Sequence, residues 1–303
     1  MVQPRAPAGP TKGVKTESER VTLAAFLAGS VLAGGNAVGV RFSNRELEPL
    51  WGAGFRFALA AAALACVMAV LGLAPPGGRA LVGALLYGAL NFGASFALLY
   101  YGLVRVQAGV AQTVLAIVPL ATLFLAVLQR QERFRAGGVV GAVIAIVGVA
   151  VMSQAPLEAG VPLLSFLALV GGALCFGQAA VLVHRLPPVH PVALNAVGMA
   201  IAAVLLVLGS LAADERIALP ERAATWAAIA YLVVVGSMLV FVLYVFVLRR
   251  WSASRAAYTF VLIPIVTVAL SAWLDDEPLG AGLVLGGMLV LAGVYVGALR
   301  AAT

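Results

Sequence analysis

Ten apolar stretches, each long enough to cross a bilayer as a helix, constrain the fold of this chain more than any other feature. A helix rises about 1.5 Å per residue, so about 20 apolar residues cross a hydrocarbon core of roughly 30 Å. The stretches are residues 21–40, 49–73, 80–103, 106–128, 136–154, 162–183, 191–212, 223–247, 255–273 and 279–300. The sequence therefore predicts an all-α polytopic membrane protein with ten transmembrane helices.

The composition predicts a lipid environment. Of the 303 residues, 63% are hydrophobic and 10% are charged, whereas a soluble domain has about half and about a quarter. The net charge of +7 comes from basic residues scattered singly between apolar blocks, which argues against a nucleic-acid partner. Cys66 and Cys175 lie in apolar runs without a CxxC pattern, so we expect no metal or cofactor. Residues 1–20 are polar and are expected to form a disordered cytoplasmic tail.

The distribution of Lys and Arg predicts the orientation. With the N-terminus inside, 13 of the 19 basic residues fall on the inner side and five on the outer side. The remaining one, Arg56, lies within a stretch. Because cytoplasmic loops carry an excess of Lys and Arg, both termini are predicted to be cytoplasmic.

The two halves of the chain repeat the same landmarks. A shift of 145 residues superimposes one set on another: Pro119, Glu132, Gly141 and Gly148 fall on Pro264, Glu277, Gly286 and Gly293. A shift of 142 aligns Gly35 with Gly177 and Pro49 with Pro191. Each copy holds five stretches, and two odd-numbered copies in tandem must have opposite orientations. The sequence therefore predicts inverted repeats at 21–154 and 162–300, with a substrate site near the membrane midplane where the two copies meet.

These landmarks resemble those of the drug/metabolite transporter superfamily and, within it, the EamA family of bacterial exporters. The resemblance covers residues 21–300 and rests on three patterns: Pro49 with Arg56, Pro119–Glu132–Gly141–Gly148, and Pro264–Glu277–Gly286–Gly293. It implies ten helices, a central cavity, a bacterial-type inner (plasma) membrane location and export of amino acids or related metabolites. One departure is that Gly198 stands where the first copy has Arg56, so this arginine cannot act symmetrically.

Polar side chains inside the stretches are the candidates for substrate binding, because such groups usually face the interior of a bundle. They are Asn36, Tyr87, Asn91, Ser95, Gln112, Gln178, Ser237, Tyr244 and Tyr258. Tyr87, Asn91 and Ser95 recur at i, i+4 and i+8, which predicts one polar helix face. That face lines a cavity or packs on another helix, and Ser237 with Tyr244 marks a similar face in the second copy. For Asn36 and Gln178 two roles are open: the amides bind the substrate, or they form hydrogen bonds with each other or with a neighbouring residue.

Three further residues are candidates for other roles. Pro119 and Pro264 each leave a backbone carbonyl without its helical hydrogen bond and are expected to kink a helix. Each kink acts either as a gate or as a static bend that shapes the bundle. Arg56 lies seven residues beyond Pro49. It holds an anionic group, extends to the interface, or pairs with a loop carboxylate.

The motifs of the main enzyme classes are absent. The sequence has no HExxH, no P-loop and no pair of membrane-embedded aspartates. One buried charge among amides, hydroxyls and aromatic rings suits a zwitterion, which favours export of neutral or aromatic amino acids by alternating access. All twelve acids lie in the tail, in loops or at the ends of stretches, which predicts facilitated rather than proton-coupled export. The alternatives are an exporter of drugs or other metabolites, and a channel or lipid translocator. The sequence leaves the oligomeric state open and is compatible with a monomer.

Overall fold

The computed structural model describes residues 12–103, 114–153, 162–274 and 281–299, and these residues form helices and no strand. The first half contains α1 (Lys12–Gly34), α2 (Asn36–Ser43), α3 (Pro49–Val70), α4 (Gly78–Gly88), η1 (Ala89–Ala94), α5 (Ser95–Leu103), α7 (Val118–Leu128) and α8 (Ala136–Ser153). The second half contains α9 (Leu163–Val183), α10 (Pro191–Ala212), α11 (Ala223–Tyr231), η2 (Leu232–Leu239), α12 (Val240–Leu248), α13 (Ala253–Ala256), α14 (Thr259–Leu274), α15 (Ala281–Val294) and η3 (Tyr295–Leu299). Segments labelled η are π-helical.

The described helices form a multi-pass membrane bundle. Six are long and apolar enough to span a bilayer: Glu17–Val40, Pro49–Val70, Gly78–Gly102, Leu163–Val183, Pro191–Ala212 and Ala223–Leu248. Four shorter apolar helices occupy the other predicted stretches: Val118–Leu128, Ala136–Val151, Ala253–Thr267 and Val284–Leu299. The all-helical membrane fold is therefore confirmed, while the count of ten crossings stays a prediction.

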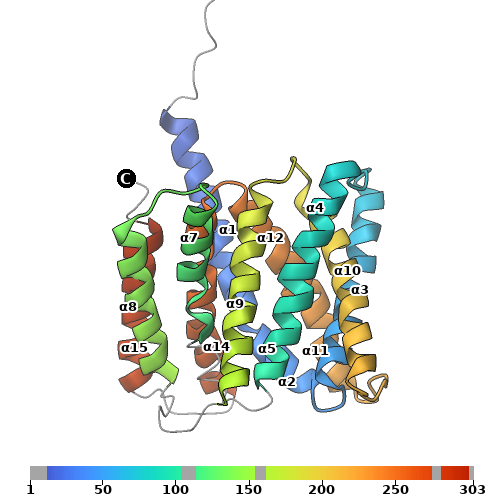
Figure 1. The fold of residues 1–303 in the computed structure, drawn as a ribbon. Helices are drawn as coiled ribbons and strands as arrows, with labels where there is room; N and C mark the ends of the chain where they lie inside the picture. Colours follow the sequence, from blue (N-terminus) through green and yellow to red (C-terminus); the bar gives the residue numbers. More distant parts are fainter. Residues whose placement is uncertain (1–11, 104–113, 154–161, 275–280, 300–303) are drawn as a thin grey trace, which may run out of the picture.

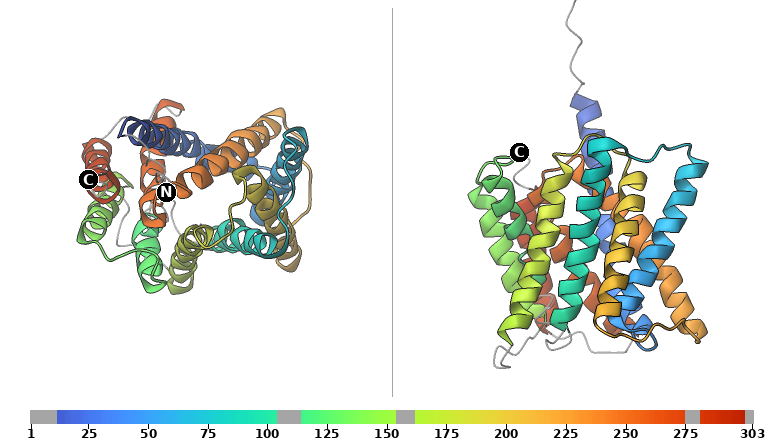
Figure 2. Two further views of the ribbon diagram at one scale, coloured as in Figure 1. Left: turned by 90° about the horizontal axis from the view of Figure 1, so that it is seen from above. Right: turned by 45° about the vertical axis from the view of Figure 1, so that its right-hand side comes forward.

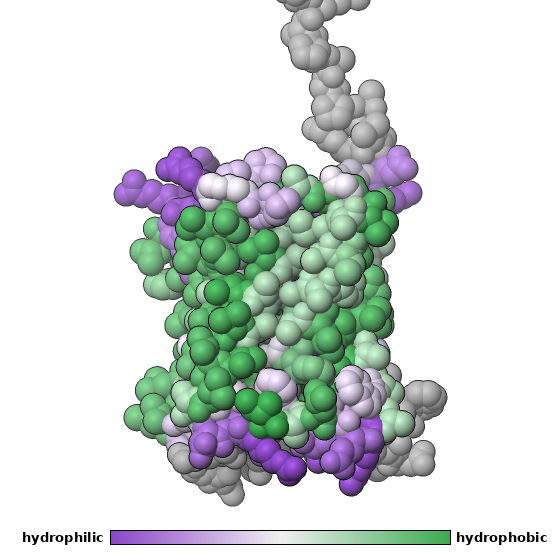
Figure 3. All heavy atoms as spheres, turned by 90° about the vertical axis from the view of Figure 1, so that its right-hand side faces the viewer, coloured by the Kyte–Doolittle hydropathy of each residue, from purple (hydrophilic) through white to green (hydrophobic). Residues whose placement is uncertain are grey.

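The surface of the bundle agrees with this assignment. On the face at the α3–α10 end, a broad hydrophobic band separates hydrophilic residues at the two ends (Figure 3). Large apolar side chains are exposed on several helices, including Val82, Phe124, Leu208, Val234 and Leu291. Such a continuous apolar surface would be unstable in water and is what lipid requires.

The two halves pack with an approximate two-fold relation. α9 opens the second half and runs opposite to α1, which opens the first (Figure 1). α3 packs on α10 and α8 packs on α15, and these two pairs lie at opposite ends of an elongated bundle (Figure 2). α1 contacts α12 and α14, while α9 contacts α5 and α7. Because each contact maps onto another when the halves are exchanged, the arrangement fits two inverted five-span repeats.

The repeated glycines lie where α8 and α15 meet. A Cβ atom on Gly141 would lie 2.6 Å from the carbonyl oxygen of Gly293, and one on Gly148 would lie 2.8 Å from that of Gly286. Only glycine allows backbones to approach so closely, and small residues mark close helix contacts in membranes. The glycines that revealed the repeat in the sequence therefore form one helix contact between the halves.

The predicted disordered tail is wrong in its second part. α1 begins at Lys12, so residues 12–20 are helical. The helix is held by Glu19, whose carboxylate lies 2.6 Å from Nη2 of Arg255 and accepts a hydrogen bond from Trp251 Nε1 at 3.3 Å. These partners come from the second half of the chain, so a local reading of composition could not reveal them. Residues 1–11 lie outside the described part of the chain.

Candidate substrate site

Two π-helical segments occupy equivalent places in the two halves. η1 lies between α4 and α5, and η2 lies between α11 and α12. The 145-residue shift places Leu232–Leu239 on residues 87–94, which overlaps η1. In π-helix each hydrogen bond spans five residues instead of four, and such segments occur frequently at functional sites. η1 holds Asn91 and η2 holds Ser237, both predicted site residues.

The π segment changes the polar face predicted for Tyr87, Asn91 and Ser95. The prediction assumed regular α-helix, but η1 lies between Tyr87 and Ser95 and alters the register by widening the turns. The ring of Tyr87 packs near Gly198 of α10, whereas the backbone at Ser95 lies against Gly172 of α9. The hydroxyl of Ser95 donates to the Asn91 carbonyl at 2.6 Å. The regular α-helical spacing on which the predicted face rested is therefore interrupted between Tyr87 and Ser95.

Several predicted site residues carry buried polar atoms without partners. Asn91 is 0% exposed, and neither its amide nitrogen nor its amide oxygen has a hydrogen-bond partner. The hydroxyls of Ser237 and Tyr244 are also buried and unpartnered. Leaving such a group unsatisfied costs about 1–3 kcal/mol. Single hydroxyls such as those of Ser165 and Ser210 are also unpartnered, but at Asn91 both polar atoms of the amide lack a partner among the described residues.

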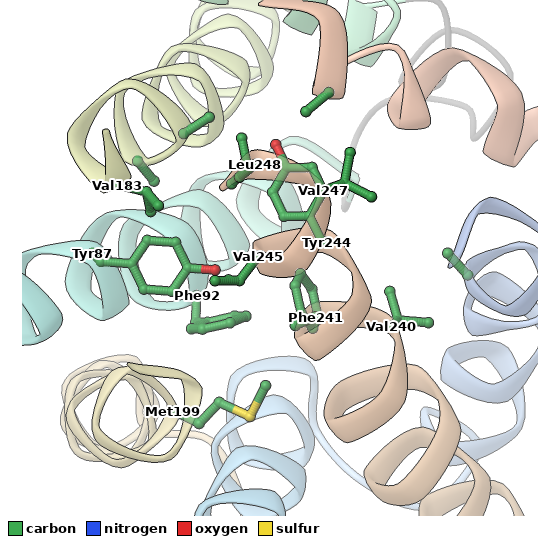
Figure 4. Packing of buried hydrophobic residues seen from close by; sticks show 14 of the residues in the cluster. Tyr87, Phe92, Val183, Met199, Val240, Phe241, Tyr244, Val245, Val247 and Leu248 are labelled. Atoms are coloured by element: carbon green, nitrogen blue, oxygen red, sulfur yellow. The ribbon is translucent and has the colours of Figure 1, made fainter. Parts of the chain in front are cut away.

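Aromatic rings surround this region. Phe92 of η1 has its centroid 4.6 Å from that of Phe241 on α12, 5.2 Å from Phe57 on α3 and 5.6 Å from Tyr87. Figure 4 shows Tyr87 and Phe92 facing the side of α12 that carries Phe241 and Tyr244. The two halves of the protein therefore meet at an aromatic contact beside both π segments.

The aromatic contacts continue through the centre of the bundle. Phe96 of α5 lies 5.9 Å from Phe176 of α9, which lies 4.9 Å from Phe260 of α14. Phe260 in turn lies 6.0 Å from Tyr244. Phe57 joins this set to Phe92 through a 5.1 Å contact with Phe96. We call Phe57, Tyr87, Phe92, Phe96, Phe176, Phe241, Tyr244 and Phe260 the aromatic core.

Arg56 lies at the edge of the aromatic core. Its guanidinium carbon is 4.6 Å from the ring centroid of Phe57 and 5.2 Å from that of Phe96. The residue is 2% exposed, and its Nε and Nη1 atoms have no hydrogen-bond partner. Among the described residues no ion pair reaches it. It therefore neither extends to the interface nor pairs with a described loop carboxylate.

Asn195 of α10 is a buried polar residue that the sequence analysis missed. Its amide nitrogen donates to the carbonyls of Phe241, at 3.1 Å, and Pro191, at 2.9 Å. Its amide oxygen lies 3.5 Å from the Tyr87 hydroxyl. Asn195 thus joins α10 to α12 and Tyr87. The rule that selected Asn91, a lone amide within an apolar stretch, would also have selected Asn195.

Three other predicted residues form hydrogen bonds with neighbouring segments and are not members of the aromatic contacts. The amide nitrogen of Asn36 donates to the Gly236 carbonyl at 3.2 Å, and Gln178 accepts from Gln129 at 2.7 Å. Each amide thus bonds to a neighbour and not to the other amide, but the buried amide oxygen of Asn36 has no partner among the described residues. The hydroxyl of Tyr258 donates to the Gly138 carbonyl at 2.8 Å, beside the α8–α15 contact.

The two prolines differ in their surroundings. Pro119 lies in the first turn of α7, directly after an interruption of the helix at residues 116–117. Pro264 lies inside α14, which continues through it. Their predicted role as gates is not tested by this arrangement. Gln112, the remaining site candidate, lies outside the described residues.

Polar contacts between the halves join the helices at both ends of the bundle. At one end, Glu132 accepts hydrogen bonds from the backbone and side chain of Ser254 and pairs with Arg135 at 3.3 Å. At the other end, Glu215 accepts from the backbone N–H groups of Leu50 and Trp51, at 3.1 and 2.8 Å. The aromatic core lies between these two sets of contacts.

A second carboxylate, Glu46, strengthens the end that holds Glu215. It pairs with Arg222 at 3.1 Å and accepts from the backbone N–H groups of Glu221 and Arg222 at 3.2 Å. Burial alone would raise the pKa of Glu46. Hydrogen bonds from the Thr225 side chain and these backbone groups, with the charge of Arg222, together outweigh it and lower the pKa.

The comparison with known families decides the identity of the fold. Residues 21–154 and 163–298 each match the EamA-like transporter family. The chain belongs to this family. Two relatives agree: an uncharacterized transporter of Archaeoglobus fulgidus, 27% identical over 85% of this chain and 91% of its own, and a protein of Streptantibioticus cattleyicolor named as a probable terminal-alkyne amino-acid exporter, 30% identical over 80% of this chain and 81% of its own. The resemblance read from the sequence is thus confirmed.

A solved structure shares the fold of this chain. One crystal structure matches 91% of this chain and 99% of its own with a TM-score of 0.79. The two sequences are 17% identical, so this likeness concerns the fold. The EamA-like protein described here is thus a membrane transporter whose two matched segments correspond to the two halves of the bundle.

Proposed function

We propose that this EamA-like transporter exports neutral or aromatic amino acids by alternating access of its two repeats. The observation that carries the proposal is the unpartnered amide of Asn91, buried beside the aromatic core. An amide both donates and accepts, so it can bind either the ammonium or the carboxylate of a zwitterion. Ser237 and Tyr244 supply two more unpartnered hydroxyls, and the aromatic rings supply an apolar environment for a side chain.

The burial of these groups supports an enclosed state of the cycle. Asn91 and Ser237 are 0% exposed and Tyr244 is 6% exposed. A substrate reaches them only when the polar contacts at one end of the bundle open. Contacts between the halves at both ends, through Glu132 and Glu215, fit a cycle in which the ends open in turn.

A relative's name favours amino acids over other metabolites. The Streptantibioticus cattleyicolor protein is named as a probable exporter of an amino acid with a terminal alkyne, which is an apolar side chain. At 30% identity the substrate of this chain can differ. Export of drugs or other metabolites is therefore the second candidate. The contacts from Phe96 through Phe176 to Phe260 favour it, because these rings would also hold an apolar molecule that is not an amino acid.

We also propose that export is facilitated rather than proton-coupled. The described acids lie at the ends of the bundle: Glu17, Glu19, Glu46, Glu48, Glu132, Asp214, Glu215 and Glu221. Proton-coupled carriers commonly use acids or histidines within their spans, which change charge during the cycle. Arg56 stays protonated and cannot relay a proton. Glu158, Asp275, Asp276 and Glu277 lie outside the described residues.

The proposed location is a bacterial-type inner membrane with both termini in the cytoplasm. The loop between α7 and α8 and the turn after α12 lie at the same end of the bundle (Figure 1). They carry Arg130, Arg133, Arg135, Arg249 and Arg250. The positive-inside rule places this end in the cytoplasm.

The test is transport by the purified protein in liposomes. We expect labelled phenylalanine to exchange with unlabelled phenylalanine in a saturable manner, which separates a carrier from a channel. Leucine and tyrosine should compete, whereas nucleosides and cationic drugs should not. An imposed pH or sodium gradient should not drive accumulation above the external concentration. Exchange with a drug but with no amino acid would refute the substrate class, and accumulation abolished by a protonophore would refute the facilitated mechanism.

A further inference from the structure

In the part of the chain that the structure describes, no anion pairs with the buried guanidinium of Arg56. Its Nε and Nη1 atoms have no partner, and the residue is 2% exposed. The neighbouring rings of Phe57 and Phe96 attract the cation but accept no conventional hydrogen bond. A buried charge is normally both paired and hydrogen-bonded. The site around Arg56 is thus chemically incomplete.

Two acids that lie at the start of α3, the helix of Arg56, are engaged elsewhere. Glu215 is held by the backbone N–H groups of Leu50 and Trp51 at the start of α3. Glu46 is held by Arg222 and the backbone around it. Neither forms an ion pair with Arg56 in the part of the chain that the structure describes.

The fold itself does not require an arginine at this place. The counterpart of Arg56 in the second repeat is Gly198, which packs directly against the backbone of Gly88. Position 198 therefore allows the close crossing of α10 with α4, while the equivalent place on α3 carries a cation. One repeat thus uses this position for packing, and the other presents two guanidinium nitrogens that have no partner among the described residues.

We propose that Arg56 binds the carboxylate of the transported molecule while the aromatic core holds its apolar side chain. The geometry suits this role because Phe96 packs on the guanidinium and, as a member of the aromatic core, also contacts Phe57 and Phe176. The unpartnered guanidinium nitrogens can donate charge-assisted hydrogen bonds to a carboxylate. The inference rests on the proposed function and narrows it: the cargo must carry a carboxylate, and its amide or its decarboxylated amine is a poor substrate.

The experiment measures phenylalanine exchange in proteoliposomes and its inhibition by phenylalaninamide and phenethylamine. For the unaltered protein we expect both analogues to compete at least about tenfold more weakly than phenylalanine, as expected for loss of a charge-assisted hydrogen bond. In Arg56→Gln we expect the half-saturation concentration for phenylalanine to rise about tenfold or more, with little change for the two analogues. Arg56→Lys should lose less, because it keeps the charge.

The matched control is Arg249→Gln, which removes an equally unpartnered guanidinium at the end of α12. It should leave the preference for phenylalanine over its amide unchanged. If the unaltered protein exchanges phenylalanine but does not distinguish it from phenylalaninamide, the Arg56 inference is overturned and the proposed function stands. An unchanged half-saturation concentration for phenylalanine in a folded Arg56→Gln variant would also overturn the Arg56 inference and leave the proposed function standing. If the unaltered protein exchanges no amino acid, the proposed function itself fails. The analogue comparison in the unaltered protein decides the question even if Arg56→Gln does not fold.

Discussion

Gly141→Ala tests whether the repeated glycines hold the α8–α15 contact. A Cβ atom at position 141 would lie 2.5 Å from the Gly297 nitrogen, whereas ordinary contacts begin at 3.4 Å. The helices must therefore separate locally by about 0.9 Å, because backbone atoms cannot rotate away. Overpacking costs about 1–3 kcal/mol, and a backbone clash places the cost near the upper end. Alanine returns up to about 1 kcal/mol of helix propensity. We expect a net loss of about 2 kcal/mol, roughly a 30-fold drop in the ratio of folded to unfolded protein.

Gly287→Ala is the matched control, because it lies on α15 and a Cβ there meets nothing within 4 Å. We expect this variant to be as stable as the parent or up to about 1 kcal/mol more stable. The measurement is thermal unfolding of both variants in the same detergent, with assembly followed by size exclusion. Equal melting temperatures for Gly141→Ala and Gly287→Ala would show that the close glycine contact is not needed, and the argument would be wrong.

Three other predictions follow from the site and the ends of the bundle. Asn91→Ala and Tyr244→Ala should each lower exchange several-fold without unfolding the protein, because each removes an unpartnered polar group beside the aromatic core; parental exchange rates in both variants would make these residues packing groups. A C-terminal reporter should be active only in the cytoplasm, and activity outside would reverse the orientation. Glu46→Gln should destabilise the protein at neutral pH, because the lowered pKa means that the folded state favours the charged carboxylate. That stabilisation is present above the carboxylate's unfolded-state pKa and is lost as the pH falls through its folded pKa, so the unfolding curves of parent and variant should converge in acid.

The large-scale organisation of the molecule could be predicted from the sequence. Apolar runs report spans directly, because lipid leaves no alternative to a continuous helix. Pro119 and Gly141 recur with their counterparts at one shift, and the structure gives a physical reason for the glycine at α8–α15. A backbone contact as short as this tolerates no other residue, so it leaves a mark in the sequence.

The details of the site could not be predicted in the same way. Nothing in the local sequence distinguishes η1 or η2 from ordinary α-helix, because a π segment reflects packing on other helices. The regular α-helical spacing assumed for Tyr87 and Ser95 is interrupted by η1 for this reason. The link from Phe96 through Phe176 to Phe260 joins residues from three spans. Such a contact exists only after the helices have packed. Asn195, in contrast, could have been found from the sequence, because it is an amide within an apolar stretch.

The inverted repeat explains why the site is asymmetric. The backbone symmetry gives both halves a π segment at the same place, η1 and η2. The side chains break the symmetry: Gly198 closes one crossing against Gly88, while Arg56 fills the equivalent position in the other half. A zwitterion has two unlike ends, and a perfectly two-fold site would present the same group to both. Under the proposed alternating access, in which the two halves exchange roles, the selectivity for a zwitterion must therefore come from the residues that differ between the halves. If this reasoning holds, Gly198→Ala should impair assembly, whereas Arg56→Gln should alter mainly the choice of cargo.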